Sequence, residues 1–206
     1  MIKVLTIERE YGSGAAGIAQ QLSDRLGWKL WDQLLTNEIA RRLECASRHI
    51  EEHEERKDPL YYRLFKAFMR GSYEGSLNAP GMKLADADGI RRITEQIVRG
   101  AGAEGNCVIV GRGSAYYLRD LPDAFHIFIY APFEEKVRRL QQQGKSEEEA
   151  IHLAGTVDQD RAAFIKQYFG IEWPARQFFQ LMINSTIGDA AAVQIILDGL
   201  SAIQKA

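Results

Sequence analysis

Apolar runs of strand length alternate along the chain with segments of helical periodicity. Several of these runs are apolar nearly throughout, which is typical of strands covered on both faces. The predicted strands are residues 2–8, 29–32, 107–111, 125–131 and 180–186. The alternation predicts an α/β fold in which about five parallel strands form one sheet, with right-handed crossovers and helices on both faces.

The segments between the predicted strands have the spacing of helices. In the first of them, Ile18, Leu22 and Leu26 share one face. Pro132 suits the first turn of a later helix, and Ser146 followed by three glutamates fits an N-cap with an acidic first turn. The predicted helices are residues 15–26, about 33 into the 50s, 88–99, 133–143, 146–168 and 189–203.

One segment, from about residue 50 to 89, breaks the alternation because it has no strand pattern. Its composition changes from charged to aromatic and then to Gly, Ser, Asn and Pro, which predicts a helical insertion with a mobile loop around 71–81. His49 and His53 have a spacing that could hold a metal on a helix, but their Glu- and Arg-rich surroundings favour a solvated helix face. No metal ligand is therefore predicted.

The composition is that of a folded globular protein. The 206 residues, 46% hydrophobic and 26% charged, predict one domain over residues 1–206 that contains the insertion. A net charge of -2 gives no basic excess for a nucleic-acid or membrane partner.

The apolar start is interrupted early by Glu8 and Arg9, which excludes a signal peptide, and no apolar run approaches the ~18 residues of a transmembrane helix. Two cysteines without metal-ligand spacing suggest free thiols, so we expect a soluble cytoplasmic protein.

The stretch from Thr6 to Gly27 has the layout of a phosphate-binding loop: a strand, a glycine turn and a helix N-terminus. Glycines let backbone N–H groups converge on an anion, and the helix adds free N–H groups and the positive end of its dipole. Such loops end in Gly-Lys-Ser/Thr, whereas this one contains Gly14-Ala15-Ala16-Gly17. A tight strand-to-helix connection would explain the glycines equally well.

Arginines at three further places favour phosphate chemistry. Arg9, just before the glycine turn, could carry the charge of the missing lysine, or it could pair with Glu8, Glu10 or Asp32. Arg112 lies between two glycines just past a buried strand, at the sheet edge where ligands bind in α/β folds. Two helices around the "QQQGKS" turn carry Arg138, Arg139, Arg161 and Lys166. Each of these cations alone could be ordinary surface charge, so the order of the features is the argument.

This order resembles that of the nucleoside monophosphate kinases. The chain is most similar to the cytidylate kinase-like family, whose members share a "REYGSG" loop. The resemblance is carried by residues 7–14, 26–32, 108–113, 158–170 and 183–186, and it covers nearly the whole chain. It implies a P-loop NTPase-like core of three layers, a helical insertion at roughly 36–106 that binds the acceptor, and a helical lid at roughly 138–170.

The activity that the resemblance implies is transfer of the ATP γ-phosphoryl group to a nucleoside monophosphate, with CMP or dCMP as candidate acceptors. ATP and Mg²⁺ would be the cofactors, with no Mg²⁺ ligand assigned, and small-molecule nucleotides the partners. Positioning and charge neutralisation would drive the transfer, and lid closure would exclude water. Two alternatives remain open: a nucleotide-binding sensor or regulator without turnover, and an α/β protein that binds no nucleotide.

The resemblance also implies roles for individual residues. The expected ATP-binding residues are Gly12, Ser13, Gly14, Ala15, Ala16, Gly17 and Arg139, with Ala15 in the place of the loop lysine and Gly17 in the place of the Mg²⁺-binding Ser or Thr. The expected catalytic residues are Arg9, Arg112 and Arg161, and the expected acceptor-binding residues are Asp32, Arg112 and Lys166. Gly113 replaces an aspartate of the cytidylate kinases.

Overall fold

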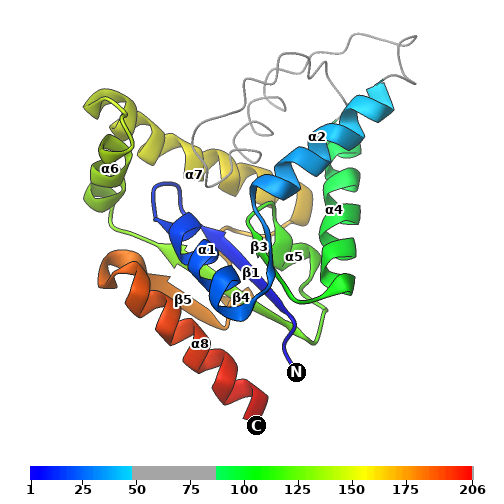
Figure 1. Ribbon diagram of the computed structural model, residues 1–206. Coiled ribbons are helices and arrows are strands. Elements are labelled where there is room, and N and C mark those ends of the chain that lie inside the picture. Colours follow the sequence, from blue (N-terminus) through cyan, green and yellow to red (C-terminus); the bar gives the residue numbers. More distant parts are fainter. Residues whose placement is uncertain (48–86, 206) are drawn as a thin grey trace.

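A computed structural model describes residues 1–47 and 87–205, and its centre is one parallel sheet (Figure 1). The strands are β1 (Val4–Arg9), β2 (Lys29–Trp31), β3 (Cys107–Val110), β4 (Ala124–Tyr130) and β5 (Leu181–Asn184). Their order across the sheet is β2-β3-β1-β4-β5. All five predicted strands are confirmed, with ends that differ by at most two residues.

Strand β1 is central and is buried along its whole length. Its residue Val4 lies opposite Cys107 of β3 and Ala124 of β4, in parallel register. The chain leaves β1 toward β2 on one side and later crosses from β3 over β1 to β4 on the other. The strand order therefore reverses beside β1, and in open α/β sheets ligands bind outside the carboxyl ends of the strands at such a point.

Helices cover both faces of the sheet. They are α1 (Ala15–Leu26), α2 (Gln33–Ser47), α4 (Ala87–Glu104), α5 (Ser114–Tyr117), α6 (Phe133–Gln142), α7 (Glu147–Phe169) and α8 (Asp189–Lys205). Helices α1 and α8 pack on one face, while α2, α4, α5 and the end of α7 pack on the other. The predicted three layers are confirmed, whereas the short helix α5 was not predicted because four residues carry no periodicity.

The hydrophobic core lies on both faces of β1. One cluster joins Leu5 and Ile7 to Ile18 of α1 and Val193 of α8. The other cluster joins Val4 to residues of α2, α4 and α7, among them Leu35, Ile97 and Phe164. Burial of side chains of this size contributes about 1.5–3 kcal/mol each, so the sheet and its flanking helices form a rigid base for the loops above them.

Helices α6 and α7 form a hairpin that packs on the loop after β1. Leu140 of α6, with Leu153 and Val157 of α7, forms a small cluster around Tyr11. The N-terminus of α7 matches the sequence prediction, since the Ser146 hydroxyl accepts a hydrogen bond from the Glu149 amide at 3.2 Å. The predicted insertion at 36–106 includes α2 and α4, but its loop at 71–81 lies outside the described residues, so its boundaries stay a prediction.

Candidate phosphate-binding site

The carboxyl ends of the parallel strands bring together residues that are far apart in the sequence. Arg9 ends β1, Asp32 follows β2, Arg112 follows β3 and Ser185 follows β5. In Figure 1 this edge points up toward α2, α6 and α7, and both termini lie at the opposite end. The predicted site residues Arg9, Asp32 and Arg112 therefore share the edge at which α/β proteins bind ligands.

The loop between β1 and α1 has the backbone of an anion site. Gly12 and Gly14 have φ angles of 75° and 79°, in the left-handed region that favours glycine. Gly14 is the N-cap of α1, its first turn has no acidic residue, and no side chain of the described residues caps the helix. The N–H groups of the first turn have no acceptor within the helix, so they and the helix dipole favour a bound anion.

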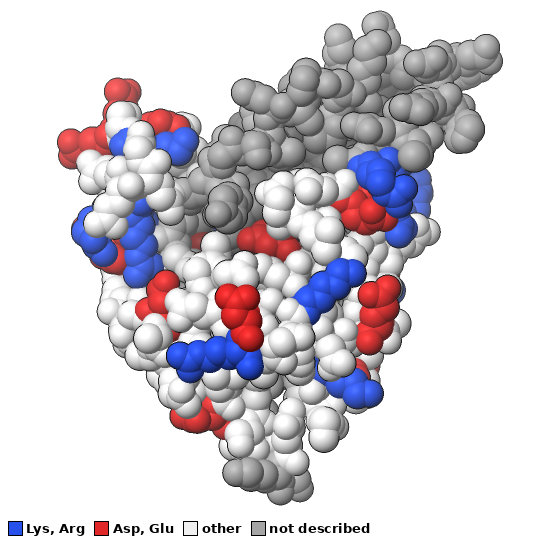
Figure 2. Space-filling view, in the orientation of Figure 1, with Lys and Arg blue, Asp and Glu red and all other residues white. Residues whose placement is uncertain are grey.

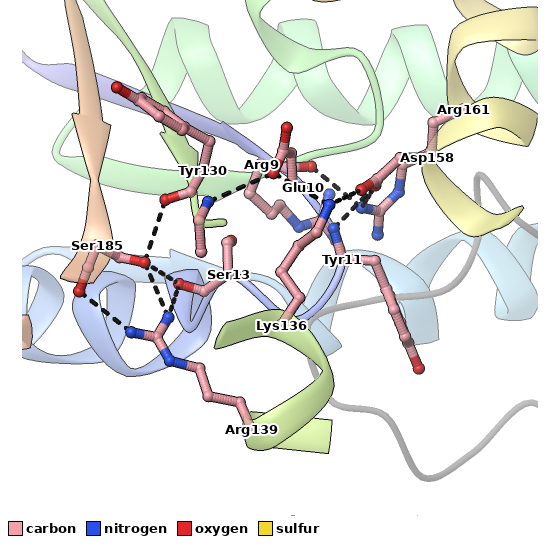
Figure 3. A network of polar contacts seen from close by, with 11 residues as sticks. Arg9, Glu10, Tyr11, Ser13, Tyr130, Lys136, Arg139, Asp158, Arg161 and Ser185 are labelled. Atoms are coloured by element: carbon pink, nitrogen blue, oxygen red, sulfur yellow. Dashed lines mark hydrogen bonds and ion pairs between the residues drawn. The ribbon is translucent and has the colours of Figure 1, made fainter. Parts of the chain in front are cut away.

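Helix α6 lies directly against this loop. A Cβ atom added at Gly12 would lie 3.2 Å from the Lys136 carbonyl oxygen, and one added at Gly14 would lie 2.8 Å from Nη1 of Arg139. The two glycines therefore permit both the left-handed turn and the close approach of α6. Arg139 also donates to the Ser13 carbonyl oxygen and, at 2.8 Å, to the Ser185 hydroxyl (Figure 3).

A partly buried ion-pair cluster joins the start of the loop to the hairpin (Figure 3). Lys136 Nζ lies 3.2 Å from Glu10 Oε2 and 3.2 Å from Asp158 Oδ2. The Tyr11 amide donates to Asp158 Oδ1 at 2.8 Å, and Arg161 donates to the same oxygen at 3.1 Å. Sequence reasoning missed Lys136 and Asp158 as site residues. Only the spacing of Asp158 and Arg161, three residues apart on one helix, could have suggested their pairing.

Three arginines are buried beside this cluster. Arg9, Arg112 and Arg161 are only 4%, 2% and 6% exposed. Arg161 donates to the Arg9 carbonyl oxygen at 3.1 Å, and Arg112 donates to the Thr36 hydroxyl of α2 at 2.6 Å. Arg112 has a φ angle of 61°, which is uncommon for a residue with a side chain, and strain of this kind gathers at functional sites.

The electrostatics of the arginines favour a bound anion. Burial, with the repulsion of Arg9 added, lowers the pKa of Arg112 to about 9. Burial, with the repulsion of Arg161 added, lowers the pKa of Arg9 to about 10. Asp32 and Glu8 partly offset these effects, although burial raises the pKa of Glu8 itself. A phosphate would supply the further negative charge that stabilises the guanidinium ions.

The structure does not gather every predicted residue. The Lys166 side chain is 66% exposed and pairs with Glu172 at 2.6 Å, so its role at the acceptor stays a prediction.

Gly17, in the first turn of α1, has a neighbour that the sequence did not suggest. A Cβ atom added at Gly17 would lie 2.9 Å from Oδ2 of Asp189, the first residue of α8.

The sequence profile of the cytidylate kinase-like family matches residues 4–187. The chain belongs to this family. The resemblance found in the sequence is thereby confirmed. A search of curated proteins gave no match.

Solved structures with the same fold include kinases. An uncharacterized protein from Eubacterium ventriosum superposes with a TM-score of 0.68 at 18% identity, covering 98% of this chain and 99% of the other. Shikimate kinase from Bacteroides thetaiotaomicron gives a TM-score of 0.55 at 16% identity over 98% and 99% of the two chains. Shikimate kinase from Acinetobacter baumannii, solved with shikimate, gives 0.54 at 14% identity over 98% and 94%. The predicted P-loop kinase fold is confirmed.

For this member of the cytidylate kinase-like family, family and fold together support a kinase-type phosphotransferase that binds small-molecule nucleotides. On the face in Figure 2, acidic and basic side chains are interspersed over the described surface. Within residues 1–47 and 87–205, no helix is both long and apolar enough to cross a membrane.

Proposed function

We propose that this protein transfers the γ-phosphoryl group of ATP to a nucleoside monophosphate. The observation that carries the proposal is the uncapped N-terminus of α1 at the same sheet edge as three buried arginines. This edge provides two kinds of anion site, a backbone cradle and a guanidinium cluster. A kinase that transfers a phosphoryl group from ATP to a monophosphate must bind the phosphates of both substrates, and so needs two anion sites.

On the donor side, the backbone from Gly12 to Gly17 would hold the ATP phosphates. The Ser13 hydroxyl supports this role, since it is buried and has no hydrogen-bond partner among the described residues. Buried polar groups are rarely left without a partner, so an orphaned hydroxyl in an anion-binding loop indicates a ligand. Arg139, which donates to Ser13 and Ser185, would fix the position of this loop.

On the acceptor side, Arg112 with Arg9 and Arg161 would bind the phosphate of the monophosphate. Guanidinium groups contact two phosphate oxygens at once and so orient the acceptor. Asp32 and Thr36, where β2 leads into α2, would lie on the acceptor's path toward the insertion. The family resemblance makes CMP and dCMP the first acceptors to test.

Catalysis would come from positioning and charge neutralisation. Transfer of a phosphoryl group spreads charge over the transferred oxygens, and preorganised donors stabilise that charge without reorganising. Arg161 connects α7 to the end of β1 through the Arg9 carbonyl oxygen. Closure of the hairpin over bound nucleotides would therefore bring an arginine to the phosphates and exclude water at the same time.

A carboxylate of α8 lies beside the first turn of α1, where a magnesium ion would bind with the ATP phosphates. Gly17 lacks the hydroxyl of a standard loop, but the Asp189 carboxylate oxygen lies 2.9 Å from where a side chain at residue 17 would begin. Mg²⁺ is commonly held by one or two carboxylates together with substrate phosphates. Asp189 would hold the ion, which would neutralise charge on the phosphates. Without a cation, a carboxylate beside an anion site would be repulsive.

A panel of nucleoside monophosphates with ATP and Mg²⁺ tests the proposal. We expect ADP production with at least one monophosphate, and thermal stabilisation by ATP. ATP binding without turnover on any monophosphate would contradict the kinase and favour a sensor, and no response to any nucleotide would exclude both.

The loop variants give a matched comparison. Gly14→Val should weaken ATP binding, because it fills the space beside Arg139 and removes the left-handed turn. Gly27→Val is the control, since Gly27 has a φ angle of 66° and nothing within 4 Å of an added Cβ. Unchanged ATP affinity in a folded Gly14→Val protein would contradict binding at the loop.

A further inference from the structure

We propose that Lys136 of α6 supplies the positive charge that the phosphate loop lacks. This inference rests on the proposed function. No Lys or Arg lies between Tyr11 and Asp24, so the loop itself has no cation to place near the β- and γ-phosphates. The charge must come from another element, because backbone N–H groups alone would leave the charge that moves during transfer poorly stabilised.

Two other cations lie near the loop, and contacts with protein groups hold their guanidinium groups in place. The Arg9 guanidinium packs against Gly111 at the end of β3, on the acceptor side of the site. Arg139 uses its donors on Glu135, Ser13 and Ser185, and so fixes the position of the loop. Lys136 also lies against the loop, with its Cβ and carbonyl oxygen beside Gly12.

Lys136 is held against the loop by its backbone and by its charge. Its Cβ atom would lie 3.2 Å from a Cβ added at Gly12, and the residue is only 7% exposed. Figure 3 shows its side chain running from α6 toward Glu10 and Tyr11. Both of its carboxylate partners adjoin the loop. Glu10 directly precedes the glycine turn, and Asp158 accepts a hydrogen bond from the Tyr11 amide.

The ammonium group keeps a donor for a ligand. Lysine has three N–H donors, and Glu10 and Asp158 account for two of them among the described residues. Lys136 and Arg161 together balance the charges of Glu10 and Asp158, so the cluster presents no excess negative charge to an incoming phosphate. The third N–H would donate to a β- or γ-phosphate oxygen.

Stability alone does not require a charge at this position. A buried ion pair loses much of its attraction to the cost of desolvation, and apolar replacements of such pairs are often neutral or stabilising. Lys136 neutralises Glu10 and Asp158, and a ligand would use its ammonium group in addition to these ion pairs. Because it comes from α6, the ATP site would be complete only when the hairpin packs on Gly12. Closure of the hairpin would thereby bring the positive charge of Lys136 to the ATP phosphates.

Calorimetric titration with ATP and with AMP tests the role of Lys136. We expect Lys136→Met to weaken ATP binding by about tenfold or more, the scale of one hydrogen bond to a charged group. AMP, which lacks the β- and γ-phosphates, should bind the variant and the wild type equally. Lys136→Arg should recover part of the loss. Lys29→Met is the control, since Lys29 begins β2 at the opposite end of the sheet and has an exposed side chain.

The outcomes separate this inference from the proposed function. A folded Lys136→Met protein that binds ATP like the wild type would overturn the role of Lys136 and leave the kinase intact. Equal losses for ATP and AMP would also overturn it, because they would indicate a structural role. Failure of the wild type to bind ATP would overturn both.

A second measurement covers the case in which Lys136→Met does not fold. Nitrogen-15 NMR of the wild-type lysine ammonium groups, assigned with Lys136→Arg, should show the Lys136 signal shifting on addition of ATP but not of AMP. An unshifted signal at saturating ATP would overturn the proposal.

Discussion

The guanidinium group of Arg9 occupies the space in which residue 111 would carry its side chain. A Cβ atom at Gly111 would lie 1.6 Å from Nη1 of Arg9, closer than any non-bonded contact allows. Gly111 also has a φ angle of 65°, so it serves both the turn after β3 and the packing of Arg9. Because Arg112 follows directly, this contact sets how the two arginines lie relative to each other.

Gly111→Ala should therefore displace Arg9 and disturb the acceptor site. The left-handed backbone alone costs an alanine about 1–2 kcal/mol, and overpacking adds about 1–3 kcal/mol. Urea unfolding should show the summed loss of stability, and the acceptor KM should rise. Gly27→Ala, which has a φ angle of 66° and open space around an added Cβ, should lose only the backbone contribution. Equal losses in the two variants would contradict the packing role of Gly111.

Arg112→Ala should raise the acceptor KM by about 10–100-fold, the loss expected for a hydrogen bond to a charged group. ATP affinity should change little, because Arg112 follows β3 and donates to Thr36 of α2. Steady-state kinetics at saturating ATP measure the first effect and calorimetry the second. Arg119→Ala, an exposed arginine nearby in the sequence, is the control. A variant that only unfolds at a lower temperature, with unchanged KM, would make Arg112 structural.

Asp189→Asn should raise the Mg²⁺ concentration that half-maximal ATP binding requires, by about tenfold for the loss of one carboxylate ligand. Calorimetry of ATP binding across a Mg²⁺ series measures this shift without reference to turnover. Asp198→Asn, which removes an exposed acid on the same helix, should leave the Mg²⁺ dependence unchanged. If both variants behave like the wild type, Asp189 does not hold the ion.

Stability should fall between about pH 6.5 and pH 4 because of His126. Burial lowers the pKa of His126 from 6.5 to about 4, and its Nδ1 lies 2.7 Å from the Thr6 hydroxyl in the core. As the pH falls, the unfolded chain takes up the proton first, so the folded state loses up to about 3 kcal/mol over this window. Urea unfolding across the pH range measures the loss. It should shrink in His126→Gln and persist in His152→Gln, which removes an exposed histidine.

The sequence by itself determined the order of the elements and the position of the anion-binding loop. The strands and longer helices follow from apolar spacing, which depends only on neighbours a few residues away. The parallel sheet follows from their alternation, and it brings Arg9, Asp32 and Arg112 to one edge whatever the details of packing. The loop was readable because its glycines and its helix start are consecutive in the chain.

The tertiary structure decided which side chains complete the loop. Lys136 reaches Glu10 across 126 residues, and Asp158 reaches the Tyr11 amide across 147. The direction of Arg9 toward Gly111 and the approach of Asp189 to Gly17 depend likewise on how distant elements pack. Periodicity places a residue on a helix or a strand, but it carries no information on which distant element will pack against it. A charged residue on α6 therefore looks the same in the sequence whether it faces solvent or a phosphate loop, and only the packing of α6 on Gly12 distinguishes Lys136 from its exposed neighbour Arg138.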